Sequence, residues 1–224
     1  MNQLSTTMNL LFMLCGCLAF ALLVHGQAQS GSFISIDCGY NGSDYNDYGT
    51  ISYTSDEGCV DTGTNYNISP DYALSLQRSN LRSFPKGIKN CYTIKSEQAK
   101  GNKYLIRAIF TYGPYGNYDS KNDPPEFDLY LDGDHWTTIK IEAASDNLFA
   151  EIIHVPATAY IHVCLVNTGL GTPFISALEL RPLNNSIYQV EHGSLKLFTR
   201  IDVGSTTNDT VRYGLASIES RNVR

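Results

Sequence analysis

The chain has 224 residues, of which 42% are hydrophobic, and this length can bury one sizeable core, so one main domain is expected. The formal net charge is −6, and the sequence contains no run of basic residues. A chain of this charge attracts phosphate backbones weakly, which argues against nucleic acid as a partner.

Residues 1–28 have the composition of a secretory signal peptide. They carry no charged side chain, and an almost unbroken apolar run at 10–24 is followed by the small residues Gly26 and Ala28. We therefore predict that the chain is exported to the extracellular space and that cleavage removes this segment. The apolar run also approaches the roughly 20 residues that span a bilayer, so the alternative is an uncleaved anchor at the plasma membrane.

If the chain is exported, its cysteines can form disulfides, because disulfides form in oxidising compartments. Two cysteines, Cys15 and Cys17, lie in the signal segment, and an even number remains after it. The disulfide candidates, which allow three connectivities, are Cys38, Cys59, Cys91 and Cys164. No pair has C-x-x-C spacing, so the sequence lacks the usual signature of redox or zinc chemistry.

Four N-x-S/T sequons predict surface asparagines that are open to glycosylation in an exported chain. The acceptor residues are Asn41, Asn67, Asn184 and Asn208. Pro70 directly follows the Asn67 sequon and makes it the weakest of the four candidates.

Short extended segments separated by Gly, Pro, Asn and Asp follow one another along the chain. Strands are expected at 33–39, 50–54, 90–95, 103–110, 127–131, 137–141, 152–155, 159–166 and 174–181. Residues 55–83 are expected to be mostly loop with short extended pieces. No helical periodicity is sustained over 11 residues. The pattern predicts an all-β protein, a β-sandwich or jelly roll with long aromatic loops at its ends.

The most informative stretch is residues 103–133, which is predicted to form a strand, a long loop and a second strand. Phe127, Leu129 and Leu131 alternate with polar or amphipathic residues, the pattern of a strand with one buried face. Asp132 and Gly133 then supply the residues of a two-residue hairpin turn.

The loop between these two strands carries three tyrosines among glycines, asparagine, aspartates and prolines, and their rings are expected to stay near the surface. A tyrosine offers a flat apolar face and a polar rim, which suits stacking on a sugar ring or gripping a peptide. The alternative is a loop that packs on its own aromatic rings. Together with neighbouring loops, the predicted ligand-binding residues are Tyr40, Tyr45, Tyr112, Tyr115, Tyr118, Asn117, Asp119 and Asn167.

Several long motifs carry a family resemblance: NLRSFPKG, NCYTIK, GNKYLIRA, PEFDLYLDG, EIIHVP and VCLVNTGLGTPFISALELRPL. Over about residues 32–213 the chain resembles the malectin-like extracellular domain of plant leucine-rich-repeat receptor-like kinases. The resemblance implies a malectin-like β-sandwich at 32–190. Malectin holds a glucose disaccharide with loop aromatics and an acid, but Tyr112-Gly-Pro-Tyr115 replaces its aromatic pair here, so disaccharide specificity is not carried over. Cys59 stands where the family usually has an aromatic or apolar residue, so the resemblance does not imply its pairing.

The sequence also contains a short internal echo. The pattern I-D-x-G occurs at 36–39 and again at 201–204, and each copy is followed by a sequon. The resembled family has two malectin-like lobes in tandem, so residues 191–224 are predicted to be a linker and the start of an incomplete second lobe. A strand without its sheet partners exposes backbone groups, so this part is expected to be frayed.

Enzymatic signatures are missing from the sequence, which has no G-x-S-x-G elbow, H-E-x-x-H motif or P-loop. His154 and His162 are predicted to be partly buried strand histidines. Four acids, Asp119, Asp123, Glu126 and Asp128, could flank a glycosidic bond or share a calcium ion, but a solvated strand face and loop explain them. No metal or other cofactor is expected.

These observations predict a glycosylated, non-enzymatic module that recognises an oligosaccharide as part of, or derived from, a receptor-like kinase ectodomain. The alternative is a peptide- or protein-binding or receptor-pairing scaffold, with a receptor kinase or co-receptor as partner. A glycan hydrolase that uses Glu126 or Asp128 is the remaining rival.

Overall fold

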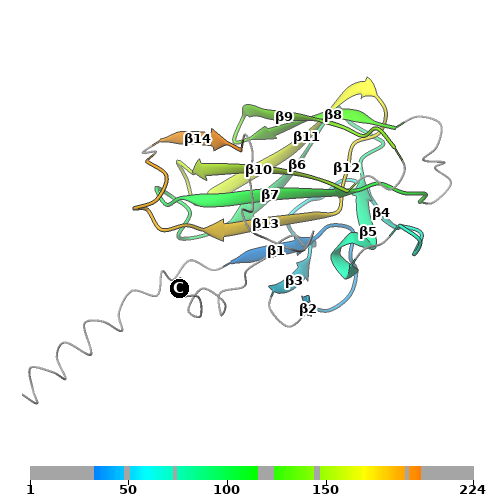
Figure 1. Cartoon of the computed structure of the whole chain (residues 1–224), viewed down its shortest axis with the longest axis horizontal. Coiled ribbons are helices and arrows are strands. Elements are labelled where there is room, and N and C mark those ends of the chain that lie inside the picture. The colour runs from blue at the N-terminus through cyan, green and yellow to red at the C-terminus, as the bar shows by residue number, and fades with distance from the viewer. Residues whose placement is uncertain are drawn as a thin grey trace, which may run out of the picture. The chain divides into compact units, whose positions relative to one another are not determined.

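The computed structural model describes residues 33–47, 51–72, 75–115, 124–143, 147–189 and 192–197. Within these ranges the regular structure is almost entirely strand, with one short 3-10 helix, η1 (Leu76–Arg78). The prediction of an all-β fold is confirmed (Figure 1). The predicted signal segment, most of the C-terminal segment 191–224 and the second I-D-x-G copy lie outside the described residues.

The described strands form three sheets, and in them every pair of neighbouring strands is antiparallel except β1 and β3. The first sheet has the order β14 (Gly193–Lys196), β10 (Asn147–Val155), β7 (Tyr104–Thr111), β13 (Ala177–Pro182), β1 (Ile34–Asp37), β3 (Ile51–Ser55) and β2 (Tyr45–Asp47). The second has the order β6 (Lys89–Lys95), β11 (Tyr160–Leu170), β8 (Glu126–Leu131) and β9 (Asp134–Lys140). The third comprises β12 (Phe174–Ile175), β5 (Asn80–Ser83) and β4 (Thr64–Asn67).

The seven-stranded and four-stranded sheets enclose the main core between their facing sides (Figure 1). Ile106 and Phe110 of β7 belong to the same buried cluster as Leu129 of β8 and Val163 of β11. The rings of Phe110 and Phe127 meet edge to face between the two sheets, with centroids 5.7 Å apart. Burying aromatic and branched side chains from both layers is the main stabilising contribution to such a sandwich.

The β8–β9 hairpin is formed as predicted. Buried and half-buried residues alternate along β8, with Phe127, Leu129 and Leu131 buried. The turn residues Asp132 and Gly133 have φ values of 47° and 99°, the left-handed conformation that tight hairpin turns require. β9 lies at the edge of its sheet, with no described strand on its other side.

Other expectations need correction. β10 begins at Asn147 rather than at 152, and β11 continues to Leu170 rather than ending at 166. β4 and β5 lie in segment 55–83, where short extended pieces within a loop were expected, whereas β14 was not predicted. Periodicity missed the first half of β10 because Glu151, a residue typical of a solvated face, is buried there by an ion pair with Arg107.

One disulfide joins the strands β6 and β11. Cys91 and Cys164 occupy directly opposite positions in the register of these strands, with Cα atoms 4.0 Å apart. The other two candidates, Cys38 and Cys59, are free thiols. Cys38 is fully buried, and burial raises the pKa of its thiol well above the ordinary value.

The outer face of the seven-stranded sheet carries a buried row of charged residues. Glu151, Arg107 and Glu179 are cross-strand neighbours on β10, β7 and β13. Arg107 Nε donates to Glu151 Oε1 at 2.6 Å, and Tyr53 Oη donates to Glu179 Oε1 at 2.6 Å. Arg181 also donates to Glu179. Each buried carboxylate is therefore matched by donors, as burial of charge requires.

Candidate ligand-binding site

The two described tyrosines of the central loop are part of the core. Tyr112 is 0% exposed, and its ring stacks on that of Phe174 with centroids 5.6 Å apart. Tyr115 is also buried and lies against the ring of Tyr66 at 5.1 Å. The prediction that these two rings stay near the surface is therefore wrong, because the loop packs on aromatic rings from β12 and β4. In this arrangement neither ring offers a free face for stacking.

Tyr40 and Tyr45 belong to a different part of the fold. Tyr45 packs against a small cluster on the outer face of the seven-stranded sheet, where its ring stacks on Tyr53 at 5.6 Å. The Tyr40 ring meets Tyr45 edge to face at 5.3 Å, and both residues are half-buried. The structure therefore divides the predicted tyrosines between two clusters.

The hydroxyl of Tyr45 donates to Asp37 Oδ2 at 2.7 Å, and Asn80 Nδ2 donates to Asp37 Oδ1 at 2.8 Å. Burial raises the pKa of Asp37 to about 7, although these two hydrogen bonds oppose the rise. Burial and the hydrogen bond to Asp37 also raise the pKa of Tyr45. This carboxyl therefore titrates near neutral pH beneath the Tyr40–Tyr45 pair.

The remaining predicted site residues have mixed placements. Asn167 lies at the β11 irregularity, where its side-chain oxygen accepts from the backbone N–H of Gly169 at 2.8 Å. Tyr118, Asn117 and Asp119 lie outside the described residues, as does the Asn208 sequon. The other three acceptor asparagines, Asn41, Asn67 and Asn184, are exposed. Ligand binding by these residues and glycosylation of the asparagines stay predictions.

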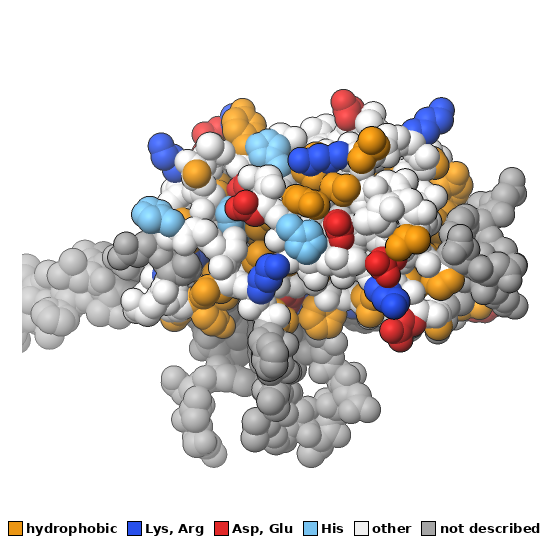
Figure 2. Space-filling view, turned by 90° about the horizontal axis from the view of Figure 1, so that it is seen from above, with side chains coloured by type: hydrophobic (Ala, Val, Ile, Leu, Met, Phe, Trp, Pro, Cys, Tyr) orange, Lys and Arg blue, Asp and Glu red, His pale blue; other side chains and the backbone are white. Residues whose placement is uncertain are grey.

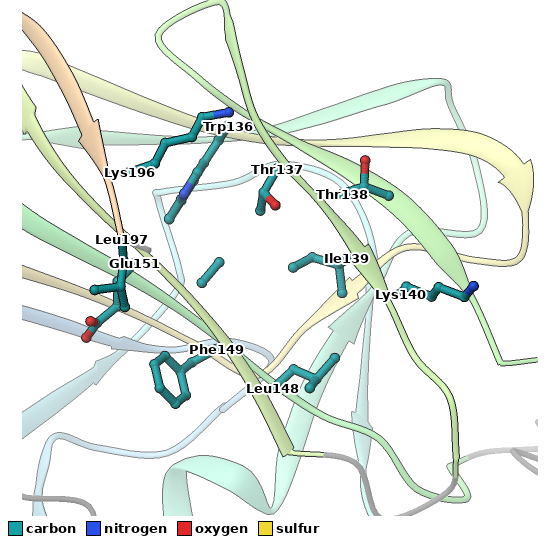
Figure 3. Close-up of a pocket in the computed structure, with 11 residues that line it drawn as sticks. Trp136, Thr137, Thr138, Ile139, Lys140, Leu148, Phe149, Glu151, Lys196 and Leu197 are labelled. Atoms are coloured by element: carbon teal, nitrogen blue, oxygen red, sulfur yellow. The ribbon is translucent and has the colours of Figure 1, made fainter. Parts of the chain in front are cut away.

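A groove lies between the edge strand β9 and the first half of β10 (Figure 3). Its volume is about 430 Å³, which falls within the range of ligand pockets. The apolar lining comes from Trp136 and Ile139 of β9 and from Leu148, Phe149 and Ala150 of β10, with Leu197 at one end. Sequence reasoning missed this groove, because nothing in the local pattern reveals where a neighbouring strand stops.

Among the described residues, β14 covers only part of β10, and the groove lies beside the remainder. Residues 152–155 of β10 pair with β14, whereas its first half has a strand partner only on the β7 side among the described residues. Phe149 and Leu197 both line the groove and are 47% and 39% exposed. Adjacent exposed apolar side chains of this size can mark an interaction surface. An exposed strand edge beside apolar side chains is a common docking surface.

Charged side chains border this apolar lining. Lys140 and Lys196 lie on opposite sides of the groove in the close-up, whereas Glu151 is held by Arg107 (Figure 3). Figure 2 shows hydrophobic side chains with a lysine or arginine beside them on the face that is seen from above. The groove therefore combines an apolar lining with positive charge at its borders.

A chain of hydrogen bonds joins β14 to the β8–β9 turn. His154 Nδ1 lies 2.7 Å from Ser194 Oγ, and His154 Nε2 lies 2.8 Å from Asp132 Oδ2. The carboxylate of Asp132 also accepts from the backbone N–H of His162 at 2.7 Å. The residue types match a nucleophile, base and acid, but none of the three lines the groove. The chain acts as a structural clamp. His154 is a strand histidine with a partner at each ring nitrogen, as predicted, but it is buried rather than partly buried.

The acids of β8 show no catalytic arrangement. Asp128 Oδ1 accepts from Thr138 Oγ1 at 2.6 Å, as expected of a carboxylate on a partly solvated strand face, and Asp119 and Asp123 lie outside the described residues. In the described ranges, no group of three or more His, Cys, Asp or Glu is placed to hold a metal ion. The described part of the chain also contains no helix with the length and apolar content needed to cross a membrane.

Comparison with known proteins places this geometry in context. The family model of the malectin-like domain matches residues 36–215. A leucine-rich-repeat receptor-like protein kinase of Arabidopsis thaliana, At2g19210, is 45% identical over 211 residues, which is 92% of this chain and 24% of the relative. The receptor-like kinase At1g05700 of the same plant is 46% identical over 88% of this chain and 23% of its own length. The chain thus spans about a quarter of the length of the curated relatives it matches.

Solved structures share the fold at low sequence identity. The plant receptor-like kinase FER superposes with a TM-score of 0.58 and 13% identity, covering 70% of this chain and 43% of that one. A complex described as the plant peptide RALF23 with FER and LLG2 gives a TM-score of 0.52 and 12% identity, covering 69% of this chain and 40% of that one. At such identities the likeness shows the fold alone.

Proposed function

This chain belongs to the malectin-like family, and from that membership we propose that it is a non-catalytic lobe of a receptor-like kinase ectodomain whose ligand is a peptide or protein. The lobe would act outside the cell, as the predicted signal segment suggests. The observation that supports a peptide ligand best is the edge of β10 that no described strand covers beside an apolar groove. Backbone groups on a strand edge match those of an extended peptide and have no counterpart in a sugar ring.

The core positions of Tyr112 and Tyr115 also favour a peptide over an oligosaccharide. Sugar recognition by stacking needs an aromatic face that is open to the ligand, and both rings are packed against other aromatic residues. The FER structure with RALF23 and LLG2 gives a related fold in which a peptide and a second protein are bound together. A peptide and a co-receptor are accordingly the partners proposed for this chain.

One experiment compares the two ligand classes on the same protein. The secreted, glycosylated chain is immobilised and screened against a phage library of linear peptides and against an array of cell-wall oligosaccharides and glucose disaccharides. The proposal expects saturable binding of selected peptides, competed by the same peptide in solution, and no saturable glycan. Saturable glycans without any peptide would overturn it.

An oligosaccharide ligand remains the second candidate because Tyr40 and Tyr45 form a half-buried aromatic pair. Two amides lie near it, because the exposed Asn41 directly follows Tyr40 and its Oδ1 accepts from Nδ2 of the half-buried Asn65 at 2.7 Å. Calorimetric titration with glucose disaccharides and cell-wall oligosaccharides tests this site. If it binds sugar, saturable heat from the native chain would be lost in a Tyr40→Ala variant; absence of heat from the native folded chain would reject it.

A further inference from the structure

In the first half of β10, β7 is the one strand partner among the described residues, and specific backbone groups on the other edge face the groove. Beyond the end of β14, the N–H of Leu197 still donates to the C=O of Glu151 at 3.4 Å. Successive residues of an antiparallel strand direct their backbone groups to opposite edges, so Phe149, two residues from Glu151, points the same way. On that edge, no strand in the described ranges pairs with Phe149. The backbone N–H and C=O of Phe149 therefore face the groove as one hydrogen-bond donor and one acceptor for an added strand.

The two walls of the groove suit the side chains of an added strand. A segment that continues the line of β14 along residues 147–150 would cover about 13 Å of β10. Its alternate side chains would face the sandwich interior, where Trp136 and Ile139 of β9 and Leu148 of β10 line the groove. Branched apolar side chains suit this position because β-branched residues favour the extended backbone of an added strand, and the groove has a volume of about 430 Å³ to receive them.

The charges at the borders define the chemistry of the occupant further. Among the ion pairs of the described residues, none includes Lys140 or Lys196. Glu126 lies opposite Lys140 in the β8–β9 register and offsets part of its charge, whereas no acid pairs with Lys196 in the β10–β14 register. An acidic residue at either end of an incoming segment would therefore meet an available ammonium group.

We infer that this groove receives an extended peptide segment as an added strand on β10, with branched apolar residues in the groove and acidic residues toward Lys140 and Lys196. The inference rests on the proposed function, because it names the place and the chemistry of a peptide ligand. The N–H and C=O of Phe149 supply the strand pairing, and the two lysines select acidic ends over basic ones. The groove is a different surface from the tyrosine-bearing loops that the sequence singles out.

The test uses the whole secreted chain and a fluorescein-labelled hexapeptide, Glu-Val-Thr-Val-Thr-Glu, with Lys-Val-Thr-Val-Thr-Lys as the charge-reversed probe. Fluorescence anisotropy is expected to show saturable binding of the acidic peptide and binding about 10-fold weaker for the basic one. The double variant Lys140→Glu, Lys196→Glu is expected to weaken binding of the acidic peptide about 10-fold or more. The matched control is Lys86→Glu, Lys100→Glu, which changes net charge equally at exposed lysines outside the groove and is expected to leave binding unchanged.

Amide hydrogen exchange of Phe149, followed by NMR, reports on the strand pairing itself. The inference expects fast exchange in the free chain and exchange slowed about 10-fold or more under saturating acidic peptide. Slow exchange of Phe149 without peptide would mean that the chain already covers this edge by itself, and the inference would be wrong. If peptides from the library bind but neither Phe149 nor the lysine variants respond, the groove is rejected while the proposed function stands. If no peptide binds at all, both fail.

Discussion

Arg107 holds Glu151 on the outer face of the seven-stranded sheet, with Nε 2.6 Å from Oε1. Both side chains are buried, with 4% and 0% of their surface exposed, and Glu179 lies on the other side of Arg107. Arg107→Met would leave two buried carboxylates without the cation between them. We expect the free energy of unfolding to fall by about 3–5 kcal/mol, measured by urea denaturation of the secreted chain.

The matched control for Arg107 is an exposed ion pair. Lys95 Nζ lies 2.6 Å from Glu97 Oε1, but both side chains are more than half exposed. Lys95→Met should therefore leave the urea midpoint unchanged within error, because solvent screens such pairs. A loss below about 1 kcal/mol for Arg107→Met would show that the row of charges is hydrated rather than buried.

The clamp between β14 and the β8–β9 turn predicts a dependence on acid pH. Partial burial alone would raise the pKa of Asp132, but hydrogen bonds from His154 and from the backbone N–H of His162 outweigh it, and the pKa is lowered. A lowered pKa means that the folded chain favours the ionised carboxylate. Its contribution to stability is therefore present above the unfolded pKa of about 3.9 and is lost as the pH falls through the folded pKa.

Asp132→Asn removes this charge and keeps the turn, because asparagine tolerates the left-handed conformation that Asp132 adopts at φ 47°. We expect the variant to be less stable by about 1–2 kcal/mol at pH 6, with the difference shrinking as the pH drops below about 4. Urea denaturation across this pH range measures it, and Asp134→Asn at the exposed start of β9 is the control. A difference that stays constant down to pH 2 would contradict the prediction.

The hairpin was predictable from the sequence because its determinants are local. Alternation of Phe127, Leu129 and Leu131 fixes the buried face, and the following Asp-Gly pair fixes the turn. The burial of Tyr112 is not local, since Phe174, on which its ring stacks, lies more than fifty residues along the chain. A tyrosine among glycines and prolines has the pattern of a surface loop until that distant ring is placed against it.

The groove likewise could not be predicted from local sequence. It depends on the sheet order of the described strands, in which β14 pairs with only half of β10 and β9 lies at an edge. The net charge around the groove also depends on strand pairing. From the sequence alone Glu151 would count as a free acid, but Arg107 on the neighbouring strand neutralises it. Sequence motifs therefore gave the fold class and the family, whereas the candidate site needed the tertiary register.

Asp37 predicts the opposite pH dependence from Asp132. Burial raises its pKa from 3.8 to about 7, with a further contribution from Asp56, so the folded chain favours the protonated carboxyl. The stability associated with that proton is fully present below pH 3.8 and is lost as the pH rises through about 7. A shift of this size corresponds to an effect on the order of 4 kcal/mol.

The test is a comparison with Asp37→Asn, which is neutral at every pH and retains one oxygen to accept from Tyr45 or Asn80. Relative to this variant, the native chain is expected to lose stability progressively between pH 4 and pH 8, measured by urea denaturation in matched ionic strength. If the difference between the two proteins does not change with pH, Asp37 is ionised in the folded chain throughout and the prediction is wrong.

The four cysteines of the described residues differ in bonding and burial. Cys91 and Cys164 are bonded, Cys38 is fully buried and Cys59 is half-buried. Iodoacetamide applied to the native chain should label Cys59 slowly and leave Cys38 unlabelled, because the thiolate reacts and burial raises the pKa of both thiols. Urea without reductant should expose Cys38 as well, and reductant should then release the bonded pair. Peptide mass mapping measures the labelling of each cysteine separately.

The double variant Cys91→Ala, Cys164→Ala tests what the disulfide contributes. The bond closes a sequence separation of 73 residues, for which the loss of chain entropy in the unfolded state amounts to about 4 kcal/mol. We expect a loss of about 2–5 kcal/mol in the free energy of unfolding, with the native labelling of Cys59 retained. Labelling of Cys91 or Cys164 in the untreated, oxidised chain would contradict the pairing, and so would a disulfide-linked peptide that joins Cys38 or Cys59 to Cys91 or Cys164. Either result would mean that Cys91 and Cys164 are not bonded to each other.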